Sequence, residues 1–183
     1  MRKIVFCLVV LSFVSGEVDA QLRKSAGGGR QRLKVRHVQG AKGFELGAGI
    51  SGYGIYGAGY FSEFFKDNLY YKVGAGYEFR PVAVGDTRYS SAFADGLIGI
   101  TVLDKGSVFV NGFAGGTVAY DMLDGLVTDK KTNGVGYGAV LGGEFEFYVA
   151  NGISFLLVGS QRFIFSKEFG DRYYIGGAFR FKL

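Results

Sequence analysis

The chain has 183 residues, with 32 Gly, 18 Phe and 12 Tyr but only one Pro, one Cys, one His and no Trp. The glycines follow no every-third-residue repeat, which excludes collagen, and so many aromatic residues exclude a disordered chain. The net charge of +5 comes from a basic segment near the start, because the rest of the chain is slightly acidic. The composition therefore indicates a single aromatic and glycine-rich β domain.

The start of the chain is organised like a secretory signal peptide. Arg2 and Lys3 precede an apolar run over 4–14, and small residues lead to a cleavage site after Ala20. We expect cleavage there, because the apolar run is about half of the ~20 residues that a transmembrane helix needs. An uncleaved signal anchor is the alternative. Cleavage would remove Cys7, which would leave no thiol for a disulfide or a metal.

A basic arm follows at 21–42, before any strand pattern begins. It has three consecutive glycines and too few apolar residues to fold alone, so we interpret it as a flexible periplasmic tether. The alternatives are docking to an acidic protein partner and contact with DNA phosphates. Direct contact with nucleic acid is the weakest of these, because no aromatic residues interleave with the basic ones. The candidate docking residues are Arg23, Lys24, Arg30, Arg32, Lys34 and Arg36.

From Gly43 onward the chain shows the period-two alternation of a sheet with two different faces. The alternation predicts eight strands, at 44–51, 56–64, 71–80, 92–103, 108–120, 135–149, 153–165 and 173–183. Several of them exceed the ordinary strand length of about 5 to 6 residues and reach the ~9 to 11 that cross a bilayer at a tilt. In two strands the alternation is interrupted by further apolar residues, namely Phe93, Leu97, Leu103, Phe109 and Phe113.

Short and long connections alternate between these strands. The short ones are turns at 66–68, 104–106 and 150–151, and the long ones are polar loops at 81–87, 121–133 and 166–171. The first connection, at 51–54, is an exception, because the alternation would make it long. This rhythm is typical of outer-membrane barrels, which have tight periplasmic turns and larger outer loops.

Two eight-stranded barrels fit this pattern, and they are inside out relative to each other. A soluble lipocalin-like barrel is apolar inside, whereas a membrane barrel is apolar outside and polar inside. The charges favour the membrane barrel, because acids and bases nearly balance on one face and can pair across a narrow lumen. The predicted lumenal charge network is Glu45, Glu63, Lys72, Glu78, Arg80, Asp95, Glu144, Glu146, Arg162, Arg180 and Lys182. In the second strand this rule places Tyr56, Tyr60 and Phe64 toward lipid.

The predicted fold is therefore all-β, an eight-stranded antiparallel up-and-down transmembrane β-barrel with a flexible basic arm. Its organisation is a signal peptide at 1–20, the arm at 21–42 and the barrel at 43–183, in the lipid of the bacterial outer membrane. Side chains fill the interior of an eight-stranded barrel, so we expect it to be closed and not to be a diffusion pore.

The motifs that could carry chemistry are weak, so we predict no enzyme, no cofactor and no metal site. Two stretches, 47–52 and 52–57, match G-x-G-x-x-G, but neither opens a helix. His37 lies in the arm, so no imidazole reaches the barrel to complete a Ser-His-Asp lipid hydrolase, which is the alternative class. Asp121 begins an acidic stretch without calcium-loop spacing, and we interpret it as part of a solvated loop.

The chain ends on YYIGGAFRFKL, residues 173–183, with one face apolar to the last residue. We expect this strand to pair with the first, near 44–50, because closure leaves no exposed strand edge. Part of the segment resembles the signal by which the barrel-assembly machinery recognises a last strand. The residues that carry this resemblance are Tyr174, Gly176, Phe179 and Phe181.

Several segments resemble the TraO family of conjugative transposon proteins. They are the signal ending in Ala-Gln, KGFELGAG (42–49), GVGYGAVLGGEFEFYVANGISFLLVGSQR (134–162) and YYIGGAFRFKL (173–183). The resemblance implies a component of a conjugative DNA-transfer apparatus in the outer membrane of a Gram-negative cell, with other apparatus proteins as partners. It implies no catalytic residue. The alternative function is a stand-alone barrel for adhesion or envelope integrity.

Overall fold

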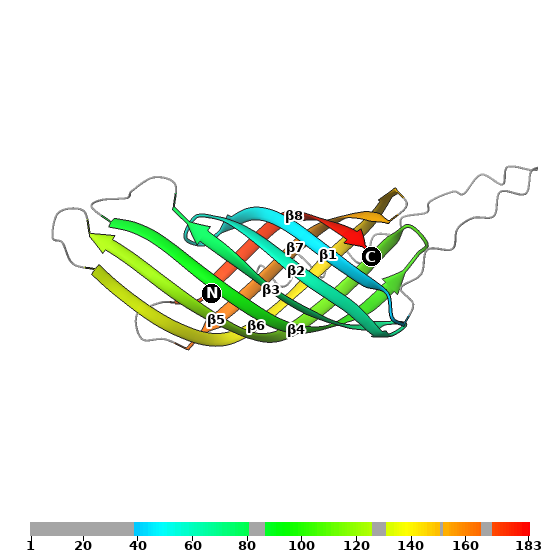
Figure 1. The fold of residues 1–183 in the computed structure, drawn as a ribbon, viewed down its shortest axis with the longest axis horizontal. Coiled ribbons are helices and arrows are strands. Elements are labelled where there is room, and N and C mark those ends of the chain that lie inside the picture. The colour runs from blue at the N-terminus through cyan, green and yellow to red at the C-terminus, as the bar shows by residue number, and fades with distance from the viewer. Residues whose placement is uncertain (1–38, 81–86, 126–130, 151, 166–169) are drawn as a thin grey trace, which may run out of the picture. The chain divides into compact units, whose positions relative to one another are not determined.

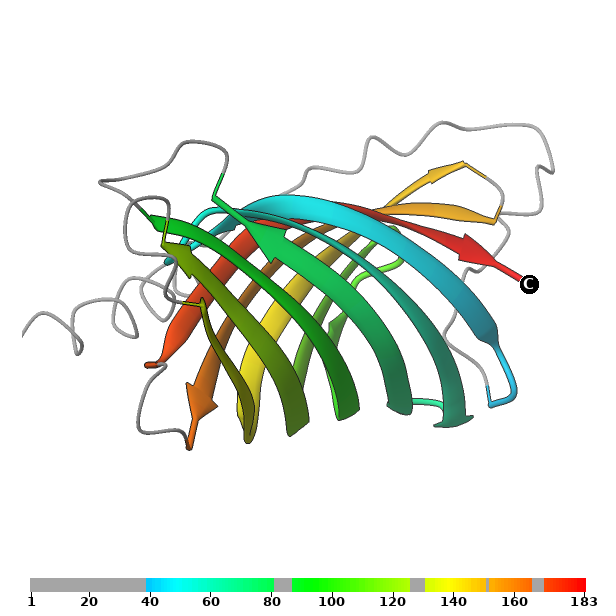
Figure 2. The same cartoon turned by 60° about the vertical axis from the view of Figure 1, so that its left-hand side comes forward.

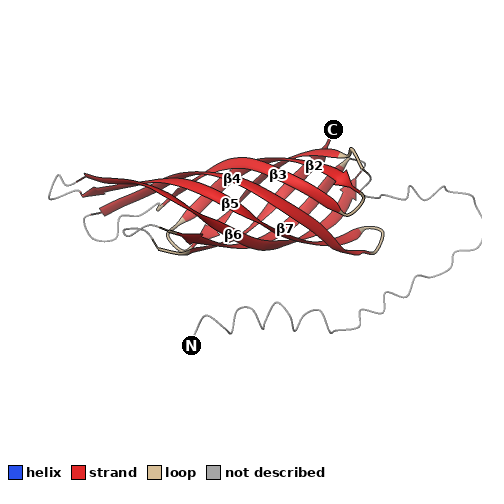
Figure 3. Cartoon of the chain, turned by 90° about the horizontal axis from the view of Figure 1, so that it is seen from below, coloured by secondary structure: helices blue, strands red, loops and turns tan. Residues whose placement is uncertain are grey.

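The computed structural model describes residues 39–80, 87–125, 131–150, 152–165 and 170–183, and these form a closed β-barrel. Eight strands follow one another around the barrel, each antiparallel to its neighbours (Figure 1). They are β1 (Lys42–Ser51), β2 (Ile55–Lys66), β3 (Leu69–Phe79), β4 (Thr87–Asp104), β5 (Val108–Gly125), β6 (Lys131–Ala150), β7 (Ile153–Ile164) and β8 (Arg172–Lys182). The predicted eight-stranded barrel is confirmed. The described residues contain strands and loops (Figure 3), and no helix among them is long and apolar enough to cross a membrane.

β8 closes the barrel by pairing with β1, as the sequence predicts. The register runs from Gly43 opposite Lys182 to Ser51 opposite Tyr174. The strands are tilted relative to the long direction of the barrel (Figure 2). Tilt and stagger are what allow a sheet to close on itself, and closure satisfies the backbone groups of the first and last strands.

The connections give the barrel two different ends. The terminal end, on the right in Figure 1, carries the C-terminus, the start of β1 and the short connections after β2, β4 and β6. The loop end carries the connections after β1, β3, β5 and β7. Two of the short turns contain a glycine with positive φ, Gly106 at 74° and Gly152 at 78°. These values lie in the left-handed region, which glycine adopts without steric cost.

β5 runs to Gly125 and β6 begins at Lys131, so both strands reach into the stretch 121–133 that was interpreted from the sequence as a loop. Asp121 pairs with Gly134 in the ladder between the two strands. The polar residues of this stretch suggested a turn. A strand ladder is held by backbone hydrogen bonds, however, so strands with polar side chains can extend beyond the apolar part of the barrel. β7 pairs with β6 only from Gly138 onward, so β4, β5 and β6 reach furthest at the loop end (Figure 1).

Alternate residues of each strand point into the lumen or out of the barrel. In β1, Glu45 is buried, whereas its neighbours Phe44 and Leu46 are 41% and 53% exposed. Of the five apolar residues that interrupted the sequence pattern, Leu103 lies at an irregularity in the ladder between β4 and β5 and is 39% exposed. The other four point inward and are buried: Phe93, Leu97, Phe109 and Phe113. These four interrupt the alternation because apolar side chains pack inside the lumen beside the charged ones.

β2 faces the opposite way from the prediction. Tyr56, Tyr60 and Phe64 lie on the inward-facing set with buried Ser62, so Glu63 is on the outer face. The prediction assumed that the charged residue of a strand marks the lumen. A tyrosine can also face a polar lumen, because its ring fills space while its hydroxyl reaches a hydrogen-bond partner.

Four inward-pointing aromatic rings each lie over the glycine directly opposite on the neighbouring strand. A Cβ atom at that glycine would collide with the ring in every case. The pairs are Tyr60 over Gly74, Tyr70 over Gly99, Phe93 over Gly76, and Phe113 over Gly142. The glycines therefore make room for aromatic rings in a lumen that is only eight strands wide.

This packing predicts opposite effects for two glycine substitutions near the ring of Phe113. Gly142→Ala should lower the free energy of unfolding by about 1–3 kcal/mol, because the new methyl group overpacks against that ring. Gly112 is on the outer face with no atom within 4 Å of an added Cβ, so Gly112→Ala should be neutral or stabilise by about 0.4–1 kcal/mol. Urea unfolding of both variants in lipid vesicles measures the difference. Equal effects would contradict the inward placement of Gly142.

Candidate functional site in the barrel lumen

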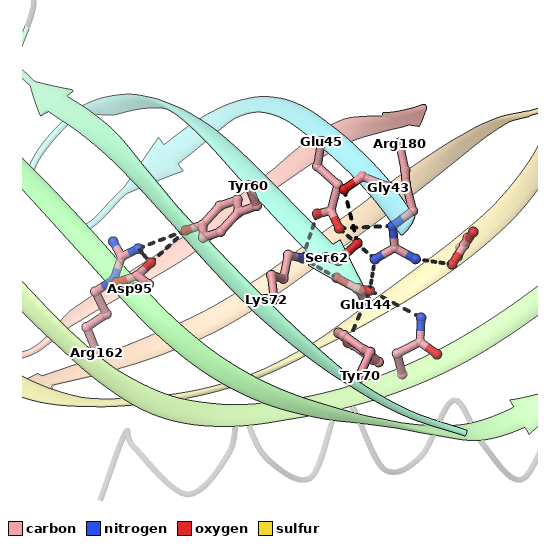
Figure 4. Close-up of polar contacts among 12 residues, drawn as sticks. Gly43, Glu45, Tyr60, Ser62, Tyr70, Lys72, Asp95, Glu144, Arg162 and Arg180 are labelled. Atoms are coloured by element: carbon pink, nitrogen blue, oxygen red, sulfur yellow. Dashed lines mark hydrogen bonds and ion pairs between the residues drawn. The ribbon is translucent and has the colours of Figure 1, made fainter. Parts of the chain in front are cut away.

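The first group of charges lies toward the terminal end, and we call it the terminal-end cluster (Figure 4). Its members are Glu45, Lys72, Glu144, Glu146 and Arg180, which come from β1, β3, β6 and β8. The guanidinium of Arg180 reaches three carboxylates, with Nη2 2.8 Å from Glu45 Oε1, 2.6 Å from Glu144 Oε1, and Nη1 paired with Glu146. Lys72 Nζ bridges two of them, 2.6 Å from Glu45 Oε2 and 2.7 Å from Glu144 Oε2.

Glu144 is the centre of this cluster. Besides the two cations, it accepts hydrogen bonds from the hydroxyl of Tyr70 and the side-chain amide of Asn111, each at 3.2 Å. A fully buried carboxylate is stable only when it is paired and hydrogen-bonded in this way. The cluster therefore ties β6 to the strands across the lumen, β3 and β8.

A second level, the middle pair, consists of Arg162 on β7 and Asp95 on β4. Arg162 Nη2 lies 2.5 Å from Asp95 Oδ2. The hydroxyl of Tyr60 donates to the same oxygen at 2.6 Å. The guanidinium of Arg162 also lies over two rings, 3.7 Å from the centroid of Phe93 and 3.9 Å from that of Tyr174. Such stacking holds a planar cation in place while its edge remains available for hydrogen bonds.

The third level, the loop-end cluster, is built around Arg172 on β8. Its Nη2 lies 2.6 Å from Asp121 Oδ2, and its Nη1 is 3.7 Å from Glu78 Oε2. Tyr174 donates its hydroxyl to Glu78 at 2.6 Å, and Ser51 also donates to Glu78. Because Tyr174 contacts both Glu78 and Arg162, it links this cluster to the middle pair.

Each level thus has one arginine that is almost completely buried, Arg180, Arg162 or Arg172. Each arginine pairs with a carboxylate on a different strand and lies near at least one aromatic ring. This arrangement occupies the lumen with fixed charges, each paired with a charge of opposite sign. It suits a structural role, because the paired oxygens and nitrogens are engaged with neighbours that would have to leave before chemistry could begin.

The structure places the predicted lumenal residues as follows. Eight of the eleven belong to the three levels: Glu45, Lys72, Glu78, Asp95, Glu144, Glu146, Arg162 and Arg180. Lys182 points inward at the terminal end, with Nζ 4.3 Å from the ring centroid of Tyr148. Arg80 lies at the loop end, where its Nε donates to the carbonyl oxygen of Tyr53 at 3.0 Å.

Glu63 is the predicted lumenal residue that the structure places elsewhere. Its carboxylate accepts a hydrogen bond from the hydroxyl of Tyr71 at 2.7 Å and lies 4.0 Å from Lys42 Nζ. Tyr71 is on the outer face of β3, so this contact is outside the barrel, near the terminal end. A carboxylate is tolerated there because the polar edge of a bilayer, unlike its centre, accepts charge.

Asp121 and Arg172 are lumenal residues that were not predicted from the sequence. The interpretation of Asp121 as part of a solvated loop is wrong, because Asp121 is fully buried against Arg172. The period-two pattern contained the signal in both strands. Asp121 has the same parity as Asn111 and Thr117, and Arg172 has the same parity as Tyr174 and Arg180.

The predicted assembly signal spans both faces of β8. Tyr174 is buried in the lumen, whereas Phe179 and Phe181 are 49% and 40% exposed on the outside. The candidate docking residues of the arm and His37 lie outside the described residues. Within the described part of the chain, no group of three or more His, Cys, Asp or Glu side chains is arranged to hold a metal ion.

No protein-family model matches this chain, and no curated protein matches it in sequence. Among solved structures, it is similar to the N-terminal β-barrel domain of OprF from Pseudomonas aeruginosa, with a TM-score of 0.64 and 12% identity over 79% of this chain and 98% of that one. A major outer membrane protein of Thermus thermophilus gives 0.66 and 11%, over 78% and 98%. The Neisserial surface protein NspA gives 0.58 and 10%, over 78% and 96%. At these identities the likeness shows the fold, that of an eight-stranded outer-membrane β-barrel.

The terminal-end cluster predicts a large cost for removing its arginine. Arg180→Met should lower the free energy of unfolding by about 3–5 kcal/mol, because three buried carboxylates would lose a cation. Lys182→Met, two residues away on the same inward face, should cost much less, because Lys182 is only partly buried. Urea unfolding in lipid vesicles compares the two variants. A loss of unfolding free energy for Arg180→Met as small as that for Lys182→Met would show that the terminal-end cluster does not hold the barrel together.

Proposed function

We propose that this protein is a closed outer-membrane barrel with a structural role, acting as an anchor in the envelope and not as a pore or an enzyme. The observation that carries the proposal is the charged lumen, in which three buried arginines and their carboxylates occupy three successive levels. A lumen filled in this way gives a solute no path. Function must then lie on the surfaces that the barrel presents to its surroundings.

The outer surface supports a membrane location. Large apolar side chains cover it on every strand, among them Leu46 at 53%, Ile98 at 64% and Tyr137 at 65% exposure. Soluble monomers rarely expose a continuous apolar surface of this kind, whereas a lipid bilayer requires one. With the predicted signal peptide and assembly signal, this surface favours export, insertion by the barrel-assembly machinery, and residence in outer-membrane lipid.

The loop end is where the first candidate function, adhesion or envelope integrity, would act. There β4, β5 and β6 extend beyond their neighbours (Figure 1), and such extensions in outer-membrane barrels stand on the outer side. Ail of Yersinia pestis, named for attachment and invasion, has the same fold at a TM-score of 0.53 and 11% identity, over 79% of this chain and 100% of that one. We propose that this end is the surface that meets partners.

The second candidate function is that of a subunit of a conjugative DNA-transfer apparatus. The resemblance of segments 42–49, 134–162 and 173–183 to the TraO family favours it. In this role the barrel would anchor other apparatus proteins to the outer membrane, and the basic arm would be a tether or docking segment on the inner side. Direct contact with DNA is not required.

A closed lumen predicts that the purified barrel conducts no ions. Reconstituted into a planar bilayer at neutral pH, it should give no discrete current steps above the background of protein-free lipid. A general porin inserted into the same membrane shows that the measurement detects open barrels. Stable, well-resolved channels from the unaltered protein would contradict the proposal.

Gene deletion separates the two candidate functions. If the protein belongs to a conjugation apparatus, deletion should abolish transfer of the mobile element while leaving detergent resistance and surface attachment unchanged. If it acts in adhesion or envelope integrity, transfer should persist and one of the other two properties should fall. Re-expression of the full chain is the control. Loss of none of the three would exclude both candidates.

A further inference from the structure

A chamber of about 40 Å³ lies in the lumen between the middle pair and the terminal-end cluster. Asp95 and Arg162 of the middle pair line it together with Tyr174, and Glu45 and Lys72 line it from the terminal-end cluster. Most of the remaining wall is apolar, including Ala58, Leu97 and Phe113, and Tyr56, Tyr60 and Ser160 add hydroxyl groups to it. The chamber is therefore lined by both charge levels, which form two separate groups of polar contacts (Figure 4).

Polar atoms of the middle pair lack a partner among the described residues. They are Nε and Nη1 of Arg162 and Oδ1 of Asp95. Their side chains are only 4% and 1% exposed, so bulk water does not reach them. Buried donors and acceptors of this kind are almost always hydrogen-bonded in folded proteins, because leaving them unpaired is costly.

The charge of the chamber indicates what occupies it. Two cations, Arg162 and Lys72, face two carboxylates, Asp95 and Glu45, so a bound anion or cation would add an unbalanced charge to a buried space. Water carries no net charge and can both accept from a guanidinium and donate to a carboxylate. A chamber of about 40 Å³ exceeds the ~10–15 Å³ that one buried water needs.

We propose that this chamber is a permanent water-binding site, in which bound water accepts hydrogen bonds from Arg162 and donates one to Asp95. The water completes the hydrogen bonding of the middle pair and bridges it to the terminal-end cluster. It lies between two levels of paired charge, so the lumen holds water without offering a continuous path to either end. This site does not depend on which of the two candidate functions is correct.

The proposal is tested by whether Ala58→Val lowers or raises the urea concentration at the midpoint of unfolding. Ala58→Val places extra methyl groups in the chamber, and we expect it to lower the urea midpoint, because displaced water would leave Arg162 and Asp95 unpaired. In a dry chamber the same change would fill a void and raise the midpoint. Ala94→Val is the matched control, because Ala94 is exposed on the outer face. A raised midpoint for Ala58→Val, with Ala94→Val unchanged, would overturn the proposal.

A second variant distinguishes the loss of bound water from steric overpacking by the added methyl groups. In an Arg162→Met background the chamber has fewer polar atoms to satisfy, so Ala58→Val should lower the midpoint by less than it does in the unaltered barrel. An unchanged loss would mean crowding and would count against bound water. If Arg162→Met does not fold, a high-resolution crystal structure of the unaltered barrel decides. Water within hydrogen-bond distance of Arg162 and Asp95 would support the proposal, and a chloride ion or no density there would overturn it.

Discussion

The structure depends on the pairing of buried charges across a lumen that is too narrow to hold bulk solvent. Arg162 on β7 reaches Asp95 on β4, Arg172 on β8 reaches Asp121 on β5, and Lys72 on β3 reaches Glu144 on β6. None of these pairs joins neighbouring strands. The backbone ladder connects each strand only to the next, so opposite walls are connected by these charges and by buried apolar contacts such as that of Phe93 on β4 with Tyr174 on β8. Removing one partner would leave another charge buried without compensation, which is far more costly than losing a surface ion pair.

The same constraint explains the glycines and aromatics that dominate the composition. Long arginine side chains and aromatic rings cannot all fit inside eight strands unless other inward positions are small. The rings over glycine, such as Phe113 over Gly142 and Phe93 over Gly76, meet this requirement one pair at a time. Arg162 then rests on the ring of Phe93, so glycine, ring and guanidinium form successive layers. Packing the charged and aromatic side chains inward closes the interior, and the alternate residues then give the barrel an apolar exterior. Both features favour a structural role in the membrane.

The faces of most strands were predicted correctly because side chains alternate with a period of two wherever a ladder is regular. In β1, for example, Phe44 faces outward and Glu45 faces the lumen. The prediction was wrong for β2, where Tyr60 and Glu63 both carry polar groups and charge alone was used to choose the lumenal face. Tyr60 lies inside because its hydroxyl reaches Asp95, a residue 35 positions away in the chain. The prediction was also wrong at Asp121, where a turn-favouring residue continues the ladder toward its partner on β8.

The number of strands, the closure of β8 on β1 and the charged interior under an apolar exterior can all be predicted from the residue pattern alone. These are properties of alternation and strand length, which the local pattern of residues encodes. Three features become visible only in the folded barrel: which charge pairs with which, the separate levels of the arginines, and the chamber beside Arg162. These features depend on the tilt and stagger of the closed barrel. Shear sets which inward positions meet across the lumen, and it brings together residues from strands that share no ladder.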